Sequence, residues 1–587
     1  MPRDPETQHT SPSTPGTQPP STQTPGAQTP ATRTRSAPPS PDPEPVRLDA
    51  AIIGAGFGGM YALHRLRDDL GLNTHAFEAG EGVGGTWYWN RYPGARCDAE
   101  SVFYSYSFDA DLQQEWVWSE RYAAQPEILS YAEHVADRLD LRRSITFGTR
   151  VTAAHYDESR RLWLLTTDTG QHVEARYLVT ALGCLSAAQA PDFKGLEDFR
   201  GEIHHTARWP HEGVELAGKR VAVIGTGSSG IQSVPEIARL AEHLTVFQRT
   251  PHFTIPARNQ PFTEAEFDDI RSRYPQLRAQ ALEDGAGLPL DPAHGNAADL
   301  TEAERAAELD RRWQQGGLAF AATFADLLTD ESANSIAADY VRERIGETVQ
   351  DPRTAELLTP TDYPLATKRI CLDTGYYETY NRENVTLVSV RNTPIERITP
   401  TGIRVSAADH EDGADNGDGT DHEFDVIVFA TGFDAMTGSY TRMDLRGRDG
   451  RELAEAWREG PRTYLGLAVS GFPNLFTVTG PGSPSVLGNM MACVEQHVDW
   501  ITGYIDHLEK TGVAAAEAEE GAQDSWVEHV AEVASATLYP KAGSWYMGAN
   551  VEGKPRVFMP YAGGLNLYRQ QCDEIAAQGY PGFSHTS

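Results

Sequence analysis

The fold is decided by residues 48–59, Leu48-Asp-Ala-Ala-Ile-Ile53-Gly54-Ala-Gly56-Phe57-Gly-Gly59. The apolar run predicts a buried strand, and the Gly-x-Gly-x-x-Gly pattern after it precedes a helical segment over residues 60–67. Gly54 permits a tight turn, Gly56 lets the backbone approach a pyrophosphate, and Gly59 lets the helix pack on the strand. A chance glycine-rich turn is the alternative, but the complete strand–turn–helix order favours a dinucleotide site that includes Phe57.

The nucleotide at this site is indicated by Glu78, which follows a second predicted strand over Thr74–Phe77. A carboxylate at this place accepts hydrogen bonds from ribose hydroxyls and repels a 2′-phosphate, so FAD or NAD fits. Residues 84–98 are rich in glycine and aromatic side chains, which suit a flat isoalloxazine ring better than a second sugar. Tryptophans of an ordinary core are the alternative for this segment alone; together with the glycine turn it favours FAD. The further FAD contacts we expect are Gly85, Thr86, Trp87, Arg96, Asp98, Tyr104 and Val151.

A second site of the same kind begins at Lys219, where an apolar strand to Ile224 leads into another Gly-x-Gly-x-x-Gly and a helix from Ile231. At the place that Glu78 takes in the first site, this one has Arg249, whose planar guanidinium can clamp a phosphate with two hydrogen bonds. A 2′-phosphate is therefore accepted, which predicts NADPH; a surface arginine without a ligand is the alternative. The expected contacts are Gly225, Thr226, Gly227, Ser228, Ser229, Gly230, Gln232, Arg249 and Thr250.

Lys368 and Arg369 stand side by side in an otherwise apolar segment. Lys368 is expected to add a contact to the NADPH phosphate. Arg369 can place a fixed positive charge near the flavin, where negative charge develops during oxygen transfer. Asp98 is the natural acid to orient that guanidinium. A structural salt bridge between the two is the alternative.

Composition and length limit the remaining possibilities. The 587 residues call for two or three domains, and a net charge of −33 argues against nucleic-acid or anionic-membrane partners. The five cysteines form no C-x-x-C pair, which predicts no metal site and a cytoplasmic setting. No apolar run approaches the length of a membrane span. We expect an α/β fold with two Rossmann-like domains: a disordered Pro/Thr/Ser-rich tail over 1–46, an FAD domain over 47–185 and 400–587, and a linker plus NADPH domain over 186–399 with a helical insertion at about 262–350.

Two signatures resemble those of the type I Baeyer–Villiger monooxygenases, from about residue 48 to the C-terminus. The linker pattern F-x-G-x-x-x-H-x-x-x-W-P of this family is met without deviation by Phe199, Gly201, His205, Trp209 and Pro210. A second pattern, Gly-x-Trp followed by an aromatic-Pro-Gly and an acid, is met by Gly85, Trp87, Tyr92, Pro93, Gly94 and Asp98. Two glycine turns alone fit many flavoproteins, whereas the linker ending in Trp-Pro separates this family from the related N- and S-oxygenating flavoproteins.

The resemblance implies a mechanism. NADPH reduces FAD, reduced FAD and O2 give a C4a-peroxyflavin, and the peroxide attacks a ketone to give an ester or lactone. Arg369 and Asp98 match the family's active-site arginine and the acid beside it. Arg249, Thr250 and Lys368 match the phosphate-binding positions. Trp545 resembles a mobile-loop tryptophan over the nicotinamide ribose, and His205 is expected to couple domain rotation to NADP binding.

The ketone is the least constrained part of the prediction. General likeness points to a bulky cyclic ketone, such as the sesquiterpenoid ketones lactonised in pentalenolactone-type antibiotic biosynthesis. The partners are then a small-molecule ketone and O2, and the oligomeric state is left open. A flavin N- or S-oxygenase and a non-oxygenating NADPH flavoprotein reductase are the alternatives.

Overall fold

The structure is a computed structural model that describes residues 44–189, 191–407 and 419–587. The predicted tail lies outside the described residues as far as residue 43. Its last predicted residue, Val46, already begins the first strand, β1 (Val46–Ile53). No helix in the described ranges is both long and apolar enough to cross a bilayer.

The first sheet is built around β1, which lies parallel to β2 (Thr74–Phe77) on one side and to β6 (His172–Thr180) on the other. The strand order is β17-β4-β5-β6-β1-β2-β3, with β18 paired to β6 off this path. The remaining strands are β3 (Ile145–Thr146), β4 (Val151–Asp157), β5 (Leu162–Thr167), β17 (Asp444–Arg446) and β18 (Leu475–Thr477). The sheet therefore combines strands from both ends of the chain, as a domain formed by 47–185 and a C-terminal segment requires.

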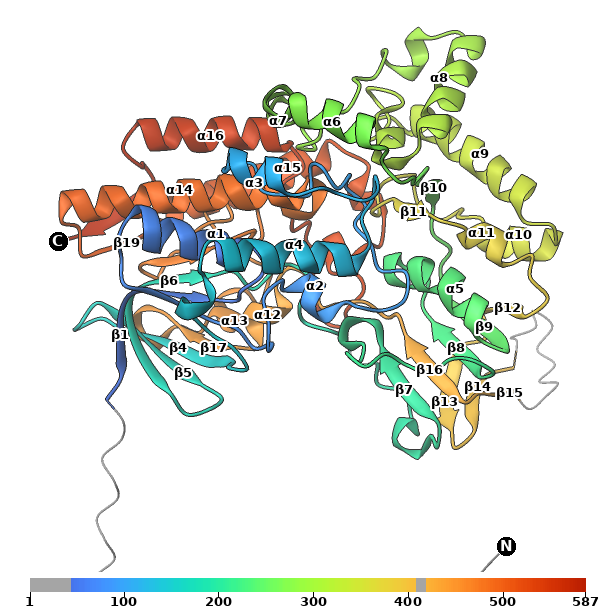
Figure 1. Ribbon diagram of the computed structural model, residues 1–587, viewed down its shortest axis with the longest axis horizontal. Helices are drawn as coiled ribbons and strands as arrows, with labels where there is room; N and C mark the ends of the chain where they lie inside the picture. Colours follow the sequence, from blue (N-terminus) through green and yellow to red (C-terminus); the bar gives the residue numbers. More distant parts are fainter. Residues whose placement is uncertain (1–43, 190, 408–418) are drawn as a thin grey trace, which may run out of the picture. The chain divides into compact units, whose positions relative to one another are not determined.

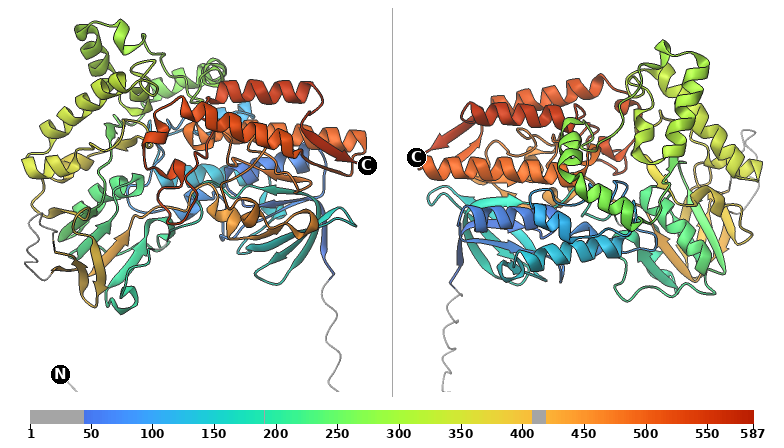
Figure 2. Two further views of the ribbon diagram at one scale, coloured as in Figure 1. Left: turned by 180° about the vertical axis from the view of Figure 1, so that it is seen from behind. Right: turned by 45° about the horizontal axis from the view of Figure 1, so that its top comes forward.

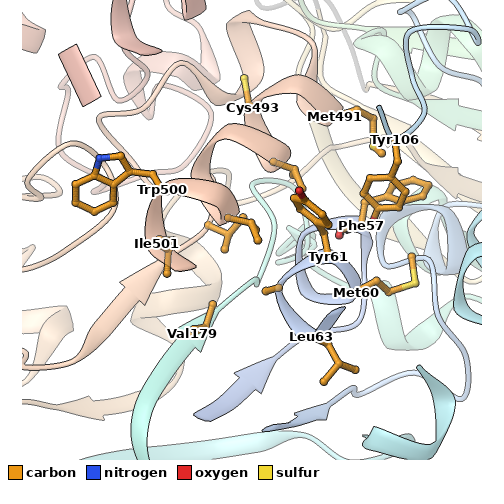
Figure 3. Close-up of a cluster of buried hydrophobic side chains, with 14 of the residues drawn as sticks. Phe57, Met60, Tyr61, Leu63, Tyr106, Val179, Met491, Cys493, Trp500 and Ile501 are labelled. Atoms are coloured by element: carbon orange, nitrogen blue, oxygen red, sulfur yellow. Dashed lines mark hydrogen bonds between the residues drawn. The ribbon is translucent and has the colours of Figure 1, made fainter. Parts of the chain in front are cut away.

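The core of this first part lies between α1 (Phe57–His64) and the long helix α14 (Met490–Thr511). Figure 3 shows Met60, Tyr61 and Leu63 of α1 near the α14 residues Met491, Cys493 and Ile501. Because α1 starts directly after the glycine turn, this packing fixes the orientation of the turn. The helix begins at Phe57, earlier than the helical segment predicted over 60–67.

The second sheet is all-parallel, with the strand order β12-β9-β8-β16-β7. Its strands are β7 (Glu202–His205), β8 (Arg220–Ile224), β9 (His243–Gln248), β12 (Val385–Ser389) and β16 (Val426–Phe429). The helix α5 (Ser228–Leu240) follows β8 and begins three residues before the predicted Ile231. Figure 1 shows this sheet, with α5 above it, apart from the sheet of β1.

The boundary predicted at residue 400 is wrong for the segment up to Phe429. All four residues of β16 are buried, and the strand pairs with β8 on one side and β7 on the other. A short antiparallel sheet of β13 (Ile395–Thr399), β14 (Gly402–Val405) and β15 (Thr420–Glu423) precedes it. β16 thus belongs to the second sheet because its buried side chains need the neighbours that β8 and β7 supply, and the chain returns to the first sheet only at β17.

Helices occupy the segment between β10 (Thr254–Pro256) and β11 (Cys371–Asp373). The main ones are α6 (Glu264–Ser272), α7 (Tyr274–Glu283), α8 (Glu302–Gln315), α9 (Glu331–Thr348) and α10 (Pro352–Leu358). Figure 2 shows these green to yellow helices beside the second sheet in both views. The predicted fold class, two Rossmann-like units with a helical insertion, is confirmed.

Candidate active site

The first glycine turn has the shape that a dinucleotide needs. Gly54 adopts a φ of +101°, and a Cβ there would lie 2.5 Å from the carbonyl oxygen of Ala181. A Cβ on Gly59 would lie 1.8 Å from the carbonyl oxygen of Gly54, so the helix can approach the turn only with glycine at this position. Gly85 faces the turn, since a Cβ on Gly56 would lie 3.3 Å from its Cα. The cradle fits the pyrophosphate of FAD.

Glu78 helps to hold this turn in place. Its side chain is buried, Oε2 accepts a hydrogen bond from Ala55 N at 2.7 Å and Oε1 accepts one from Gly80 N at 2.7 Å. Burial raises the pKa of the carboxyl, against the effect of these two backbone donors. The carboxylate that is predicted to bind the ribose is thus also bonded to two backbone amides.

Aromatic rings surround the segment that follows. Trp87 lies in α2 (Thr86–Trp89), and its Nε1 donates to Tyr104 Oη at 3.1 Å. Phe57 meets the ring of Tyr104 edge to face, with centroids 6.0 Å apart. Thr86 is exposed at the start of α2, while Val151 begins β4 and is buried. The rings of Phe57 and Trp87 both stand nearly perpendicular to that of Tyr104, and together they give the first site an aromatic wall.

The second glycine turn repeats the first. Gly225 has a φ of +112°, and a Cβ there would lie 2.4 Å from the carbonyl oxygen of Ala430, at the end of β16. A Cβ on Gly230 would lie 2.2 Å from the carbonyl oxygen of Gly225. In contrast, a Cβ on Gly227 would have no atom of the described chain within 4 Å. The turn therefore leaves space at Gly227, at the N-terminus of α5, where a helix binds phosphate best.

Side chains of this turn and of the helix after it contact neighbouring segments of the chain. Thr226 Oγ1 donates to the carbonyl oxygen of Thr250 at 3.1 Å, which joins the turn to the chain after β9. Ser228 Oγ lies 3.1 Å from Cys371 Sγ. Ser229, in the first turn of α5, is near enough to Tyr92 to lower its pKa, although burial dominates and raises that pKa to about 12.

Arg249 and Lys368 form the cationic end of this site. Arg249 is exposed, whereas Lys368 is half-buried with Nζ 4.1 Å from the ring centroid of Tyr363. Burial first, and then the charge of Arg249, lower the pKa of Lys368. Arg391 forms an ion pair with Asp362 in the same neighbourhood. Arg249 and Lys368 repel each other, so the binding of an anion between them is favoured.

Arg369 and Asp98 are brought together from positions 271 residues apart. Nε donates to Oδ2 at 2.5 Å and the second terminal nitrogen donates to Oδ1 at 2.8 Å, a two-pronged ion pair. The remaining terminal nitrogen donates to the carbonyl oxygen of Val486. Burial opposes the charge of Arg369, but Asp98 outweighs it and holds the guanidinium pKa well above its ordinary value. The pair places a permanent cation in a fixed orientation.

Sequence reasoning missed two partners of this arginine. Tyr546 lies within electrostatic range of Arg369, which counteracts the rise that burial causes in the tyrosine's pKa. Val486 contributes only its backbone carbonyl, and no side-chain pattern reports on a carbonyl. Trp545 is half-buried beside them, with its ring centroid 4.3 Å from that of Tyr546. The predicted loop tryptophan therefore lies next to the Arg369 neighbourhood.

Gln232 and Arg96 link the two parts of the site. Gln232 Oε1 accepts from Tyr92 Oη at 2.7 Å, and its Nε2 donates to the carbonyl oxygen of Arg96 at 3.0 Å. The Arg96 guanidinium in turn donates to Glu120 Oε1 and to the carbonyl oxygen of Tyr122. These bonds fasten α5 to the aromatic segment after the first turn; contacts of Gln232 and Arg96 with cofactor stay predictions.

His205 is held by three neighbours at the end of β7. Nδ1 accepts from Ala207 N at 3.0 Å, so Nε2 carries the hydrogen and meets Gln189 O and Thr431 Oγ1, each at 3.2 Å. Burial lowers the pKa of His205, which keeps the imidazole neutral. His205 thus ties the linker to the residues that follow β16.

Comparisons with known proteins place these features in a family. A model described as pyridine nucleotide-disulphide oxidoreductase matches residues 48–272. The Baeyer-Villiger monooxygenase of Pseudooceanicola batsensis is 44% identical over 535 residues, which cover 91% of this chain and 95% of that protein. The chain belongs to the Baeyer–Villiger monooxygenases.

Solved structures agree with this membership. An oxidized steroid monooxygenase bound to NADP is 51% identical, with a TM-score of 0.86 over 92% of this chain and 100% of that one. OTEMO in complex with FAD and NADP is 40% identical, with a TM-score of 0.86 over 92% of this chain and 100% of that one. A phenazine N-monooxygenase of Lysobacter antibioticus is 41% identical over 544 residues, 92% of this chain and 98% of that protein.

This Baeyer–Villiger monooxygenase is therefore an FAD- and NADPH-dependent enzyme that acts with O2 on a ketone. The predicted family, enzyme class and cofactors are confirmed.

Proposed function

We propose that the enzyme inserts one oxygen atom of O2 beside the carbonyl of a bulky cyclic ketone and releases a lactone. The observation that carries this proposal is the Arg369–Asp98 pair, a half-buried cation whose orientation is fixed by a carboxylate and a backbone carbonyl. A fixed cation stabilises the negative charge that develops on a ketone oxygen under nucleophilic attack. Sesquiterpenoid ketones of the pentalenolactone type are one candidate class of substrate.

The first glycine turn would hold the pyrophosphate of FAD, with Gly85, Trp87 and Tyr104 along its ring. Bound FAD, once reduced by NADPH, supplies the electrons and the reactivity toward O2 that oxygen insertion requires. The protein excludes water with the aromatic wall around Trp87 and orients the ketone against the Arg369 guanidinium. Asp98 holds that guanidinium in one orientation and does not itself exchange a proton.

The second turn would hold NADPH. The N-terminus of α5 with Gly227 and Ser228 receives the pyrophosphate, and the open space at Gly227 is where the phosphate backbone can come closest. Arg249 and Lys368 bind the 2′-phosphate, because an anion between them relieves their mutual repulsion. Trp545, next to Tyr546 and so to Arg369, covers the nicotinamide end.

A screen of ketones tests this function. Purified enzyme with FAD and NADPH is incubated with acetone, cyclohexanone and fused polycyclic ketones, and products are analysed by mass spectrometry with isotopically labelled dioxygen. We expect one labelled oxygen atom next to the former carbonyl, with the highest kcat/KM for the fused ketones. A highest kcat/KM for acetone would contradict the bulky substrate while leaving the oxygenase intact.

Nitrogen oxygenation is the second candidate, because a phenazine N-monooxygenase is similar to this chain over almost its whole length. The Arg369 pair argues against it as the main reaction, since an amine carries no carbonyl oxygen that needs a nearby cation. Phenazine is therefore included in the screen. An N-oxide as the only labelled product would overturn the ketone proposal.

A further inference from the structure

Arg391 leaves the second sheet beside Arg249. The strands β9 and β12 run parallel with Ser389 opposite Gln248, and Val390 N donates to the carbonyl oxygen of Gln248 at 2.8 Å. Arg249 is the first residue after β9, and Arg391 is the second residue after β12. The carboxyl ends of parallel strands lie at one edge of a sheet, and nucleotides bind at this edge in open α/β folds. Arg391 therefore stands at the same edge as the predicted 2′-phosphate site.

The Arg391 guanidinium is fixed by two neighbours. Its Nε donates to the carbonyl oxygen of Arg249 at 3.4 Å, and one terminal nitrogen donates to Asp362 Oδ2. Asp362 is itself fixed, because its Oδ1 accepts a hydrogen bond from Thr361 Oγ1 at 3.1 Å. The other terminal nitrogen of Arg391 donates to no group in the described ranges, and 43% of the side chain is exposed. One donor nitrogen of Arg391 is thus available to a ligand.

Lys368 and Arg249 also lack an acceptor among the residues that the structure describes. Lys368 Nζ lies over the ring of Tyr363 and pairs with no carboxylate there, and the side chain of Arg249 is exposed and donates to none of these residues. Burial is the main cause that lowers the pKa of Lys368; the charges of Arg249 and Arg391 lower it further, and Asp362 partly opposes them. Arg249, Arg391 and Asp362 therefore all lie within electrostatic reach of Lys368.

These four side chains form a cationic cluster whose charge matches that of a phosphate monoester. Three cations and one carboxylate leave two positive charges, in a chain whose formal net charge is −33. The second pKa of a phosphate monoester is about 6, so a 2′-phosphate carries close to two negative charges at neutral pH. Without Arg391, the cluster would keep one positive charge and an unpaired Asp362 carboxylate that repels the phosphate. Arg391 therefore brings both a donor and a counter-charge to this site.

We propose that Arg391 is a third cationic ligand of the NADPH 2′-phosphate, beside Arg249 and Lys368, and that it increases the preference of the enzyme for NADPH over NADH. The inference rests on the proposed NADPH site at the second glycine turn and adds one residue to that site. A guanidinium can donate from one terminal nitrogen to a phosphate oxygen while a carboxylate holds the other nitrogen. Arg391 is thus a specificity-determining residue and takes no part in hydride or oxygen transfer.

Binding of NADP+ and NAD+ to the oxidised holoenzyme tests this assignment without turnover. Isothermal titration calorimetry gives the dissociation constants, with 2′,5′-ADP as a smaller probe of the adenosine half. In Arg391→Gln we expect the Kd of NADP+ and of 2′,5′-ADP to rise by about tenfold, because one charge-assisted hydrogen bond is lost. The Kd of NAD+ should change by less than about twofold, since NAD+ carries no 2′-phosphate.

The variant Asp362→Asn separates direct contact from charge neutralisation. An amide at this position still accepts a hydrogen bond from Arg391 but carries no charge that needs a counter-charge. If Arg391 binds the phosphate, Arg391→Gln should weaken NADP+ binding by about tenfold in the Asp362→Asn background as well. If Arg391 only neutralises Asp362, the same change should have no effect in that background, and the assignment of Arg391 as a ligand is overturned.

Arg142→Gln is the matched control. Arg142 forms a similarly exposed ion pair with Asp137, with Nε 2.6 Å from Oδ1, in the first part of the chain. Its Kd values for NADP+ and NAD+ should equal those of the unaltered enzyme. Arg391→Lys keeps the charge but loses the two-pronged geometry, so its Kd for NADP+ should lie between those of the unaltered enzyme and Arg391→Gln. Flavin content and Tm establish that each variant is folded.

Arg249→Ala shows which of the two proposals has failed. Weaker NADP+ binding in Arg249→Ala together with unchanged binding in Arg391→Gln would overturn the role of Arg391 and leave the NADPH site in place. Unchanged NADP+ binding in Arg249→Ala would instead refute the proposed NADPH site itself. An equal loss of NADP+ and NAD+ affinity in Arg391→Gln would show that Arg391 supports the local fold, and this result would also overturn the assignment.

Discussion

The Arg369 guanidinium uses all three of its nitrogens on protein acceptors, two of them on the carboxylate of Asp98. Asp98 belongs to the segment after the first glycine turn, whereas Arg369 follows the helical insertion of the second part. The ion pair therefore forms only when both parts of the chain are in place. It joins the segment after the first glycine turn to the segment that follows the helical insertion.

Replacing Arg369 should impair ester formation but not the reduction of the flavin by NADPH. In Arg369→Ala we expect flavin reduction by NADPH to stay within about threefold, while ester formation falls by at least about 100-fold, because the cation acts where charge develops. Stopped-flow spectra report the reduction, and mass spectrometry reports the ester. Arg353→Ala, an exposed arginine of α10, is the control. Unchanged ester yield in Arg369→Ala would reject the role assigned to this cation.

Two glycines of the second turn should respond differently to the same change. A Cβ on Gly225 would collide with Ala430 O, whereas one on Gly227 would meet no described atom within 4 Å. We expect Gly225→Ala to lower Tm, and Gly227→Ala to keep Tm but weaken NADPH binding, because only a bound pyrophosphate would meet the new methyl group. Thermal unfolding and NADPH titration measure the two effects. Equal NADPH affinity in Gly227→Ala would place the pyrophosphate elsewhere.

Arg249 should distinguish NADPH from NADH. Removing a charged hydrogen-bond partner of the 2′-phosphate is expected to raise the KM for NADPH by about 10- to 100-fold in Arg249→Ala. NADH lacks this phosphate, so its KM should change by less than about threefold on the same reasoning. Arg249→Lys keeps the charge but loses the two-pronged geometry, so its KM for NADPH should lie between those of the unaltered enzyme and Arg249→Ala. Parallel increases for both nucleotides would mean that Arg249 acts on the fold of the site rather than on the phosphate.

Local patterns predicted the strand–turn–helix units well. The strand at Thr74–Phe77 has the predicted bounds, and both glycine turns adopt the left-handed φ at their first glycine. These features depend on residues close in sequence, where periodicity and glycine positions are direct signals. The pairing of Arg369 with Asp98 was predicted from chemistry and is present.

Features that depend on distant residues were harder to predict. The apolar strand β16 could join either sheet, and only its pairing with β7 and β8 decides the matter. The hydrogen bond from Arg369 to the Val486 carbonyl could not be predicted from the sequence, because every residue has a backbone carbonyl.

The buried imidazole of His497 should make stability depend on pH. His497 on α14 is fully buried, and its Nδ1 accepts from Thr479 N at 3.0 Å. Burial lowers its pKa from 6.5 to about 3. Because the folded pKa lies below the unfolded one, the stabilising contribution is complete above pH 6.5 and is lost as pH falls toward 3. The loss amounts to about 1.4 kcal/mol for each pH unit in that window.

Glutamine can accept the same backbone hydrogen bond without titrating, so His497→Gln should show a smaller drop in Tm between about pH 7 and pH 5 than the unaltered protein. His172→Gln, at an exposed histidine, is the matched control and should leave the drop unchanged. Thermal unfolding followed by flavin release and by circular dichroism gives both values. If His497→Gln and the unaltered protein lose the same Tm on acidification, the imidazole of His497 already binds its proton in the folded state, and the tautomer that accepts from Thr479 is wrong.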